Sequence, residues 1–113
     1  MKRYLACELP TDLADRLFSA SKQLQQNTVD PKQVDAAAQV LLELVELTMN
    51  YYFLRPVEIL GLGTFGHTTV RLGIKTARSG MAMIINRLAR RLTSPQRVIL
   101  ARLMEDFVLE TET

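Results

Sequence analysis

The sequence predicts an all-α fold, a compact four-helix bundle whose long, central second helix is apolar on two sides. Apolar residues recur at helical spacing in four segments, and two prolines directly follow capping residues. The composition, rich in Leu, Ala, Arg and Met with no Trp and only five Gly, also favours helices over strands. The 113 residues fit a single domain spanning 1–113.

The first helix is expected to start at Thr11, which serves as the capping residue. Acidic side chains follow it in the first turn, near the positive end of the helix dipole. Its apolar stripe consists of Leu13, Leu17, Ala20 and Leu24. The helix is expected to fade by Asn27.

The second helix is predicted to start at Asp30-Pro31 and to run to about Leu54, before Pro56. Its polar side chains form one narrow strip, made of Asp35, Gln39, Glu43, Glu46 and Asn50. The remaining apolar arc is roughly twice the ~100° that a surface helix needs. We therefore expect burial on two sides, with a partner subunit on the second side. The candidate residues for that oligomer interface are Leu44, Leu47, Tyr51 and Leu54.

The third helix is predicted over residues 67–92. One side carries an apolar stripe: Val70, Ile74, Ala77, Met81, Ile84, Ile85, Leu88 and Leu92. Basic residues lie away from this stripe: Arg71, Lys75, Arg78, Arg87 and Arg90. Leu72 and Met83 are apolar residues on the basic side. Gly73 and Gly80 weaken the helix by up to ~1 kcal/mol each and are expected to mark close helix contacts or a kink.

The fourth helix is predicted to start with Ser94 as the cap and Pro95 at the first helical position. Its apolar stripe consists of Ile99, Leu100, Leu103, Met104 and Phe107. The final Glu-Thr-Glu-Thr tail is expected to fray.

The sharpest motif is the glycine-rich segment 56–66, in which Gly61, Gly63 and Gly66 satisfy G-x-G-x-x-G. It resembles a dinucleotide-binding fingerprint, with residues 57–60 as a strand and Arg87 near an NADP phosphate. It also resembles the glycine loop of protein kinases. The first resemblance requires a parallel sheet, and the second requires H-R-D and D-F-G motifs that the sequence lacks. We predict a helix–loop–helix connection, with a nucleotide-binding turn as the alternative.

Charge is sorted along the chain. Residues 59–104 contain eight Lys or Arg and no Asp or Glu, although the net charge is only +2. Three interpretations of this basic segment stay open. It is a solvated face that the acidic strip partly neutralises, a surface that contacts nucleic acid, or a surface that contacts a membrane. For the membrane alternative, apolar residues accompany the basic ones, namely Ile59, Leu60, Leu62 and Phe65. The possible anion-binding residues are Arg71, Lys75, Arg78, Arg87 and Arg90.

No catalytic, metal-binding or cofactor-binding motif is present. Cys7 is expected to be a structural thiol, and His67 a surface or capping residue. The absence of a signal segment and of a cysteine pair favours a cytoplasmic protein, and no segment is long and apolar enough for an integral membrane protein. The sequence therefore predicts a non-enzymatic, homo-oligomeric interaction or scaffold protein without a cofactor. The alternative is a binder of nucleic acid or nucleotide phosphates, which a salt-sensitive shift with duplex DNA distinguishes.

Overall fold

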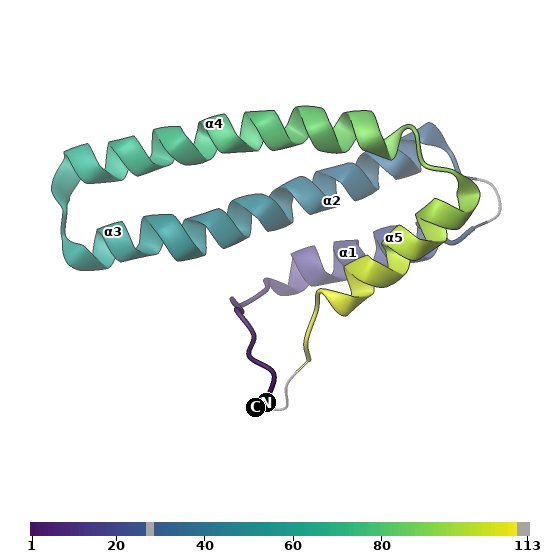
Figure 1. Cartoon of the computed structure of the whole chain (residues 1–113), viewed down its shortest axis with the longest axis horizontal. Helices are drawn as coiled ribbons and strands as arrows, with labels where there is room; N and C mark the ends of the chain where they lie inside the picture. The colour runs from purple at the N-terminus through teal and green to yellow at the C-terminus, as the bar shows by residue number, and fades with distance from the viewer. Residues whose placement is uncertain (27–28, 111–113) are drawn as a thin grey trace.

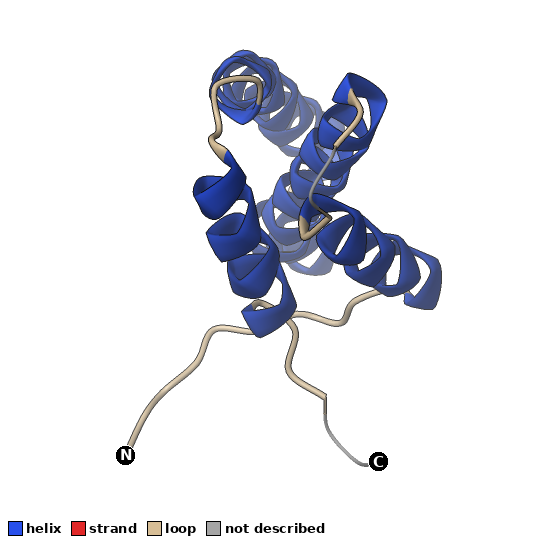
Figure 2. Cartoon of the chain, turned by 90° about the vertical axis from the view of Figure 1, so that its right-hand side faces the viewer, coloured by secondary structure: helices blue, strands red, loops and turns tan. Residues whose placement is uncertain are grey.

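The computed structural model describes residues 1–26 and 29–110, and 78% of this part of the chain is helical, with no strand in it (Figure 2). The elements in order are α1 (Thr11–Leu24), α2 (Pro31–Met49), the π-helical turn η1 (Asn50–Leu54), α3 (Arg55–Leu60), α4 (Gly63–Ala89) and α5 (Ser94–Asp106). The predicted all-α class is confirmed. The expected fading at Asn27 and the fraying of residues 111–113 lie outside the described residues.

The helix starts follow the capping chemistry of the sequence, with shifts of one residue. Asp30 caps α2 as predicted, and its carboxylate accepts the Lys32 backbone N–H at 2.9 Å. At α5 the cap is Thr93 rather than Ser94, because a capping box with Gln96 forms only from position 93. At α1 Pro10 occupies the cap position without a side-chain bond, and Thr11 is already helical.

The second helix does not end before Pro56. α2 continues through η1 into α3, and the three form one long rod (Figure 1). Proline lacks an N–H and its ring clashes with the preceding turn, so an interior proline usually breaks or kinks an α-helix. Here one wider turn precedes it, in which the Arg55 N–H donates to the carbonyl of Asn50, five residues earlier. Pro56 then lies in the first turn of α3, where a proline is tolerated.

The glycine-rich segment forms the tight turn between two antiparallel helices. Gly61 ends α3 with φ of 64°, and Gly63 begins α4 with φ of 77°. Both lie in the left-handed region that favours glycine. A Cβ on Gly66 would lie only 2.9 Å from the Leu62 Cβ. The helix–loop–helix prediction is confirmed, α4 starts four residues before the predicted His67, and the strand–turn–helix alternative is wrong.

The helices pack in the spatial series α4–α2–α1–α5, with α2 between α1 and α4 (Figure 1). The extra apolar arc of α2 is therefore occupied within the chain by α4, and that arc alone no longer requires a partner subunit. The core lies where α1, α2 and α5 meet, and its buried residues are Leu13, Leu17, Ala20, Leu24, Ala37, Val40, Ala101 and Met104. Ser21, also buried, lies 2.6 Å from Glu105 Oε1 and ties α1 to α5.

The polar strip of α2 sets its register with the neighbouring helices. Arg78 Nε lies 2.9 Å from Glu46 Oε2, and Arg90 Nε lies 3.7 Å from Asp35 Oδ1. Both pairs join antiparallel α4 to α2. Glu43 of the same strip forms a two-bond ion pair with Arg16 of α1. The expected neutralisation of basic residues by the acidic strip is thus seen at two arginines of α4.

One side of the bundle is open. Helix α5 follows α4 through a short connection but does not pack on it, so the four helices do not close into a ring. The radius of gyration is 16.1 Å, whereas a compact domain of about 100 residues has a radius near 13 Å. The excess arises because α3 and the first half of α4 project beyond α1 and α5, and because residues 1–10 extend away from the helices (Figure 1).

We predict that Gly73→Ala and Gly80→Ala each stabilise the chain by up to ~1 kcal/mol, because both glycines lie inside α4 and a helical glycine costs about that much relative to alanine. A Cβ at either position meets no atom within 4 Å. The close helix contacts expected at these glycines are therefore not made within the chain. Urea denaturation at one protein concentration measures the gain. A loss of stability in both variants would contradict this assignment.

Candidate functional site

The most unusual feature of the structure is that none of the 27 residues of α4 is buried. The helix contacts α2, η1 and α3 along one side and leaves its other sides open. Its apolar residues divide accordingly. Three of its large apolar residues are half-buried: Val70, Ile74 and Ile85. Six are exposed: Phe65, Leu72, Met81, Met83, Ile84 and Leu88. Three of these lie close together on one side of the second half of the helix and form what we term the α4 stripe: Met81, Ile84 and Leu88.

Helix α5 has a similar open side. Leu100 and Met104 face the core, whereas three other residues are about half exposed. These form the α5 stripe: Ile99, Leu103 and Phe107. Their spacing of four residues places them on one side of α5, away from the core contact. The α4 and α5 stripes therefore belong to the two helices that flank the open side of the bundle, which lie next to each other in sequence without packing together.

The residues predicted for the oligomer interface are not together on one free surface. Leu44 and Leu47 are half-buried against the α1–α2–α5 core. Leu54 is buried, and Tyr51 is exposed. The Tyr51 ring packs edge-on against Tyr52 at 5.0 Å and under the Arg55 guanidinium at 5.2 Å. Of the four, only Tyr51 is exposed, at 37%.

The predicted anion-binding residues also fall into separate groups. Arg78 and Arg90 pair with acids of α2, as described above. Arg71 and Lys75 are exposed near the beginning of α4, and Arg87 lies near its end. A turn of roughly 100° per residue places Lys75 and Arg87 about 120° apart around the helix. The five residues thus do not form a single basic stripe.

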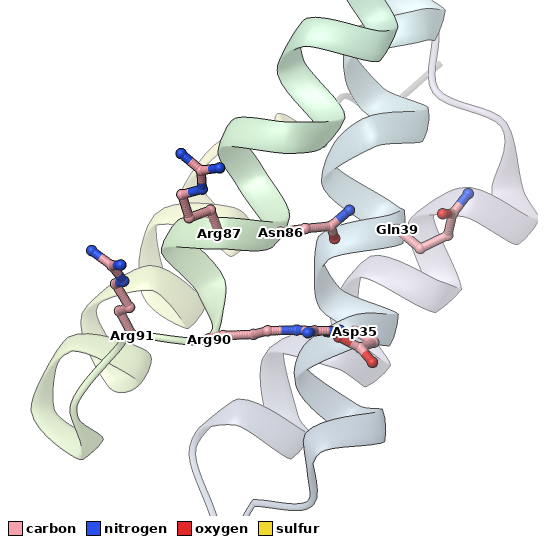
Figure 3. Close-up of a pocket in the computed structure, with 6 residues that line it drawn as sticks. All are labelled: Asp35, Gln39, Asn86, Arg87, Arg90 and Arg91. Atoms are coloured by element: carbon pink, nitrogen blue, oxygen red, sulfur yellow. Dashed lines mark ion pairs between the residues drawn. The ribbon is translucent and has the colours of Figure 1, made fainter.

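A hollow of about 610 Å³ lies between α2 and the end of α4, lined by Asp35, Gln39, Asn86, Arg87, Arg90 and Arg91. Figure 3 shows Arg90 directed at Asp35, whereas Arg87 and Arg91 leave the opposite side of α4. The three guanidinium groups do not converge on one point. A phosphate here would also meet the Asp35 carboxylate, which repels it. This geometry does not favour a specific phosphate site.

The turn between α3 and α4 presents a cluster of exposed apolar side chains that we term the tip: Ile59, Leu60, Leu62 and Phe65. Phe65 is 84% exposed, which is far from the usual state of a phenylalanine in a soluble domain. The tip lies at one end of the longest axis of the molecule (Figure 1). Behind it, His67 Nε2 lies 3.3 Å from Glu58 Oε1 and links α4 to α3.

A second hollow, of about 730 Å³, is lined by the N-terminal and C-terminal segments and by residues of α1 and α2. Half-buried Cys7 lines it, as does Tyr52, whose hydroxyl is enclosed without a hydrogen-bond partner in the described residues. Burial raises the pKa of Tyr52 above its ordinary value, and the proximity of Cys7 adds to the effect. No second cysteine exists in the sequence, so the thiol has no disulfide partner within the chain.

No protein-family model, curated protein or solved structure matches this chain. Within the described residues, no helix has the length and hydropathy that crossing a bilayer requires.

The sequence placed the α4 and α5 stripe residues within two longer apolar stripes, without indicating which of them would contact a neighbour. The helical period groups residues by side, but it does not say which side meets a neighbour. One signal was available. The predicted stripe of the third helix included both Ile84 and Ile85, which lie roughly 100° apart, so a single packing contact cannot cover them both.

Proposed function

We propose that this protein is a homo-oligomeric interaction protein, which self-associates by covering the α4 and α5 stripes of one copy with those of another. The observation that carries the proposal is that no residue of α4 is fully buried, and its apolar residues are at most half-buried. A 27-residue helix is about 40 Å long. Helices gain most of their stability from packing an apolar side, and α4 leaves the α4 stripe exposed within the chain.

The exposed area supports the same proposal. The chain exposes 8525 Å², whereas a compact monomer of 12.8 kDa exposes roughly 6,300 Å². The extended terminal segments account for part of the excess and the projecting helices for the rest. A stable interface buries ~800 Å² or more on each partner, and obligate homodimers bury more than that. The excess is therefore large enough to supply a dimer interface.

The open side of the bundle indicates how a second copy would fit. Helices α4 and α5 do not contact each other, so each has an open side. Both expose leucine and isoleucine there, and residues 59–104 contain no Asp or Glu. A two-fold axis makes the same patch meet itself, so apolar stripes meet apolar stripes. The arginines that flank them keep their charges at the rim. In this arrangement the partner completes the four-helix packing that one chain leaves open.

The proposal predicts that Ile84→Glu combined with Leu103→Glu produces a monomer. Each substitution places a charge in the centre of an apolar contact, where an unpaired charge is far more costly than in water. We expect the apparent dissociation constant to rise at least ~100-fold, which corresponds to ~2.7 kcal/mol. Sedimentation velocity over a concentration series measures it. The variant should retain its helical circular dichroism, because both positions are exposed within the chain.

Ser79→Glu serves as the matched control, since Ser79 is an exposed residue of α4 outside the α4 stripe. It should associate as the unsubstituted chain does. Leu44 and Leu47 are less useful positions, because both pack on the core and glutamate there would disturb the fold as well as any interface. A double variant that associates unchanged would show that the stripes are not the interface.

A further inference from the structure

The tip and its surroundings support an inference that does not depend on self-association. The chain reverses at Gly61 and Gly63, both at positive φ, and this tight turn brings the end of α3 beside the start of α4. Four large apolar side chains are thereby presented at one end of a 51 Å long molecule. No Lys, Arg, Asp or Glu lies between Ile59 and Val70.

Basic residues surround the base of this tip. Arg71 and Lys75 follow Phe65 on α4 by about 9 and 15 Å along the helix axis, and Arg55 precedes Leu60 by about 8 Å. All three are exposed, and none has an ion pair within the described residues. The one acid at this level, Glu58, is paired with His67. We term the three cations the collar.

Aromatic side chains lie at the same level as the collar. Tyr51 and Phe53, on the rod one turn before α3, are exposed, and Arg55 stacks over the Tyr51 ring. The order along the hairpin is thus an apolar tip, followed by aromatic and basic residues. A membrane interface has the same order, with acyl chains below the headgroups and aromatic and basic residues favoured at headgroup level.

We propose that the tip docks on an anionic lipid surface, with Ile59, Leu60, Leu62 and Phe65 entering the interface and the collar contacting the headgroups. A convex tip touches little of a flat protein surface, whereas lipid closes around it. Interfacial segments penetrate ~5–10 Å, which matches the spacing between Phe65 and Arg71. The negative potential of an anionic leaflet attracts the net positive collar, and salt weakens that attraction.

Flotation with vesicles of phosphatidylcholine, with and without phosphatidylglycerol, tests the proposal on the full chain. The protein should float with anionic vesicles and much less with neutral ones. Leu62→Ser with Phe65→Ser should lower binding at least ~10-fold, because two apolar side chains leave the lipid. Arg71→Glu with Lys75→Glu should lower binding to anionic vesicles by a similar factor and reduce its salt dependence. Leu5→Ser with Leu109→Ser, in the two terminal segments away from the tip, is the control and should bind normally.

The outcomes separate insertion from simple adsorption. A chain that stays in the soluble fraction with anionic vesicles overturns the proposal. So does a Leu62→Ser, Phe65→Ser variant that floats as well as the unsubstituted chain, because adsorption would then depend on charge alone. Equal flotation with neutral and anionic vesicles would remove the role of the collar. Circular dichroism of each variant confirms that its helices are intact.

Discussion

Replacing Leu17 with alanine is expected to destabilise the chain by about 2–5 kcal/mol, the usual cost of truncating a buried leucine. Leu17 is fully buried in α1, at the centre of the contact between α1, α2 and α5. Met104 of α5 belongs to the same core cluster and is also fully buried, so the cavity left by Leu17 weakens the packing that holds α5. A domain with a core this small has little stability in excess of that loss, because total stabilities are only about 5–15 kcal/mol.

Urea denaturation followed by circular dichroism measures the Leu17→Ala effect at a fixed protein concentration. Leu60→Ala is the matched control, because it removes the same atoms from a side chain that is 68% exposed. It should change the free energy of unfolding by less than about 0.5 kcal/mol. Equal losses in the two variants would contradict the position of the core.

Replacing both Gly61 and Gly63 with alanine is expected to cost roughly 2–4 kcal/mol, because each residue has a positive φ and the left-handed conformation costs an L-residue about 1–2 kcal/mol. Space is not the reason, since a Cβ at either position meets no atom within 4 Å. The strain would favour opening of the turn and loss of the α3–α4 contact.

The control for this variant is Gly73→Ala with Gly80→Ala, which makes the same chemical change at ordinary helical positions of α4. That control should gain stability while the turn variant loses it, as measured by urea denaturation. If the free energy of unfolding falls in the turn variant and rises in the control, the effect of Gly→Ala depends on the backbone conformation at each position. A turn variant as stable as the unsubstituted chain would contradict the positive φ values.

Local signals in the sequence account for much of the fold. The Asp30-Pro31 start of α2 and the four apolar segments were predictable because caps and periodicity act within a few residues. Pro56 was misinterpreted as a helix end for the opposite reason. Its effect depends on whether the preceding turn widens. In η1 the turn widens through a hydrogen bond from the Arg55 N–H to the Asn50 carbonyl, which no local sequence pattern predicts.

The candidate surface was less predictable, since it depends on which helices meet. The wide apolar arc of α2 indicated a second contact, but the sequence did not say that α4 would provide it. Once α4 occupies that arc, Leu44 and Leu47 face the core, and Ile84 and Leu88 are left exposed. The sorted charge was similarly ambiguous. Arg78 and Arg90 pair with α2, whereas Arg71 and Lys75 stay free of ion pairs in the described residues.

One chain leaves its bundle open, and we propose that a second copy covers the open side. The most direct test is the solution mass of the unsubstituted protein at micromolar concentration, measured by sedimentation equilibrium at low and high salt. We predict at least twice the chain mass of 12.8 kDa, with little change as salt rises, because apolar contacts are not screened. A mass of 12.8 kDa at every concentration tested would contradict the account.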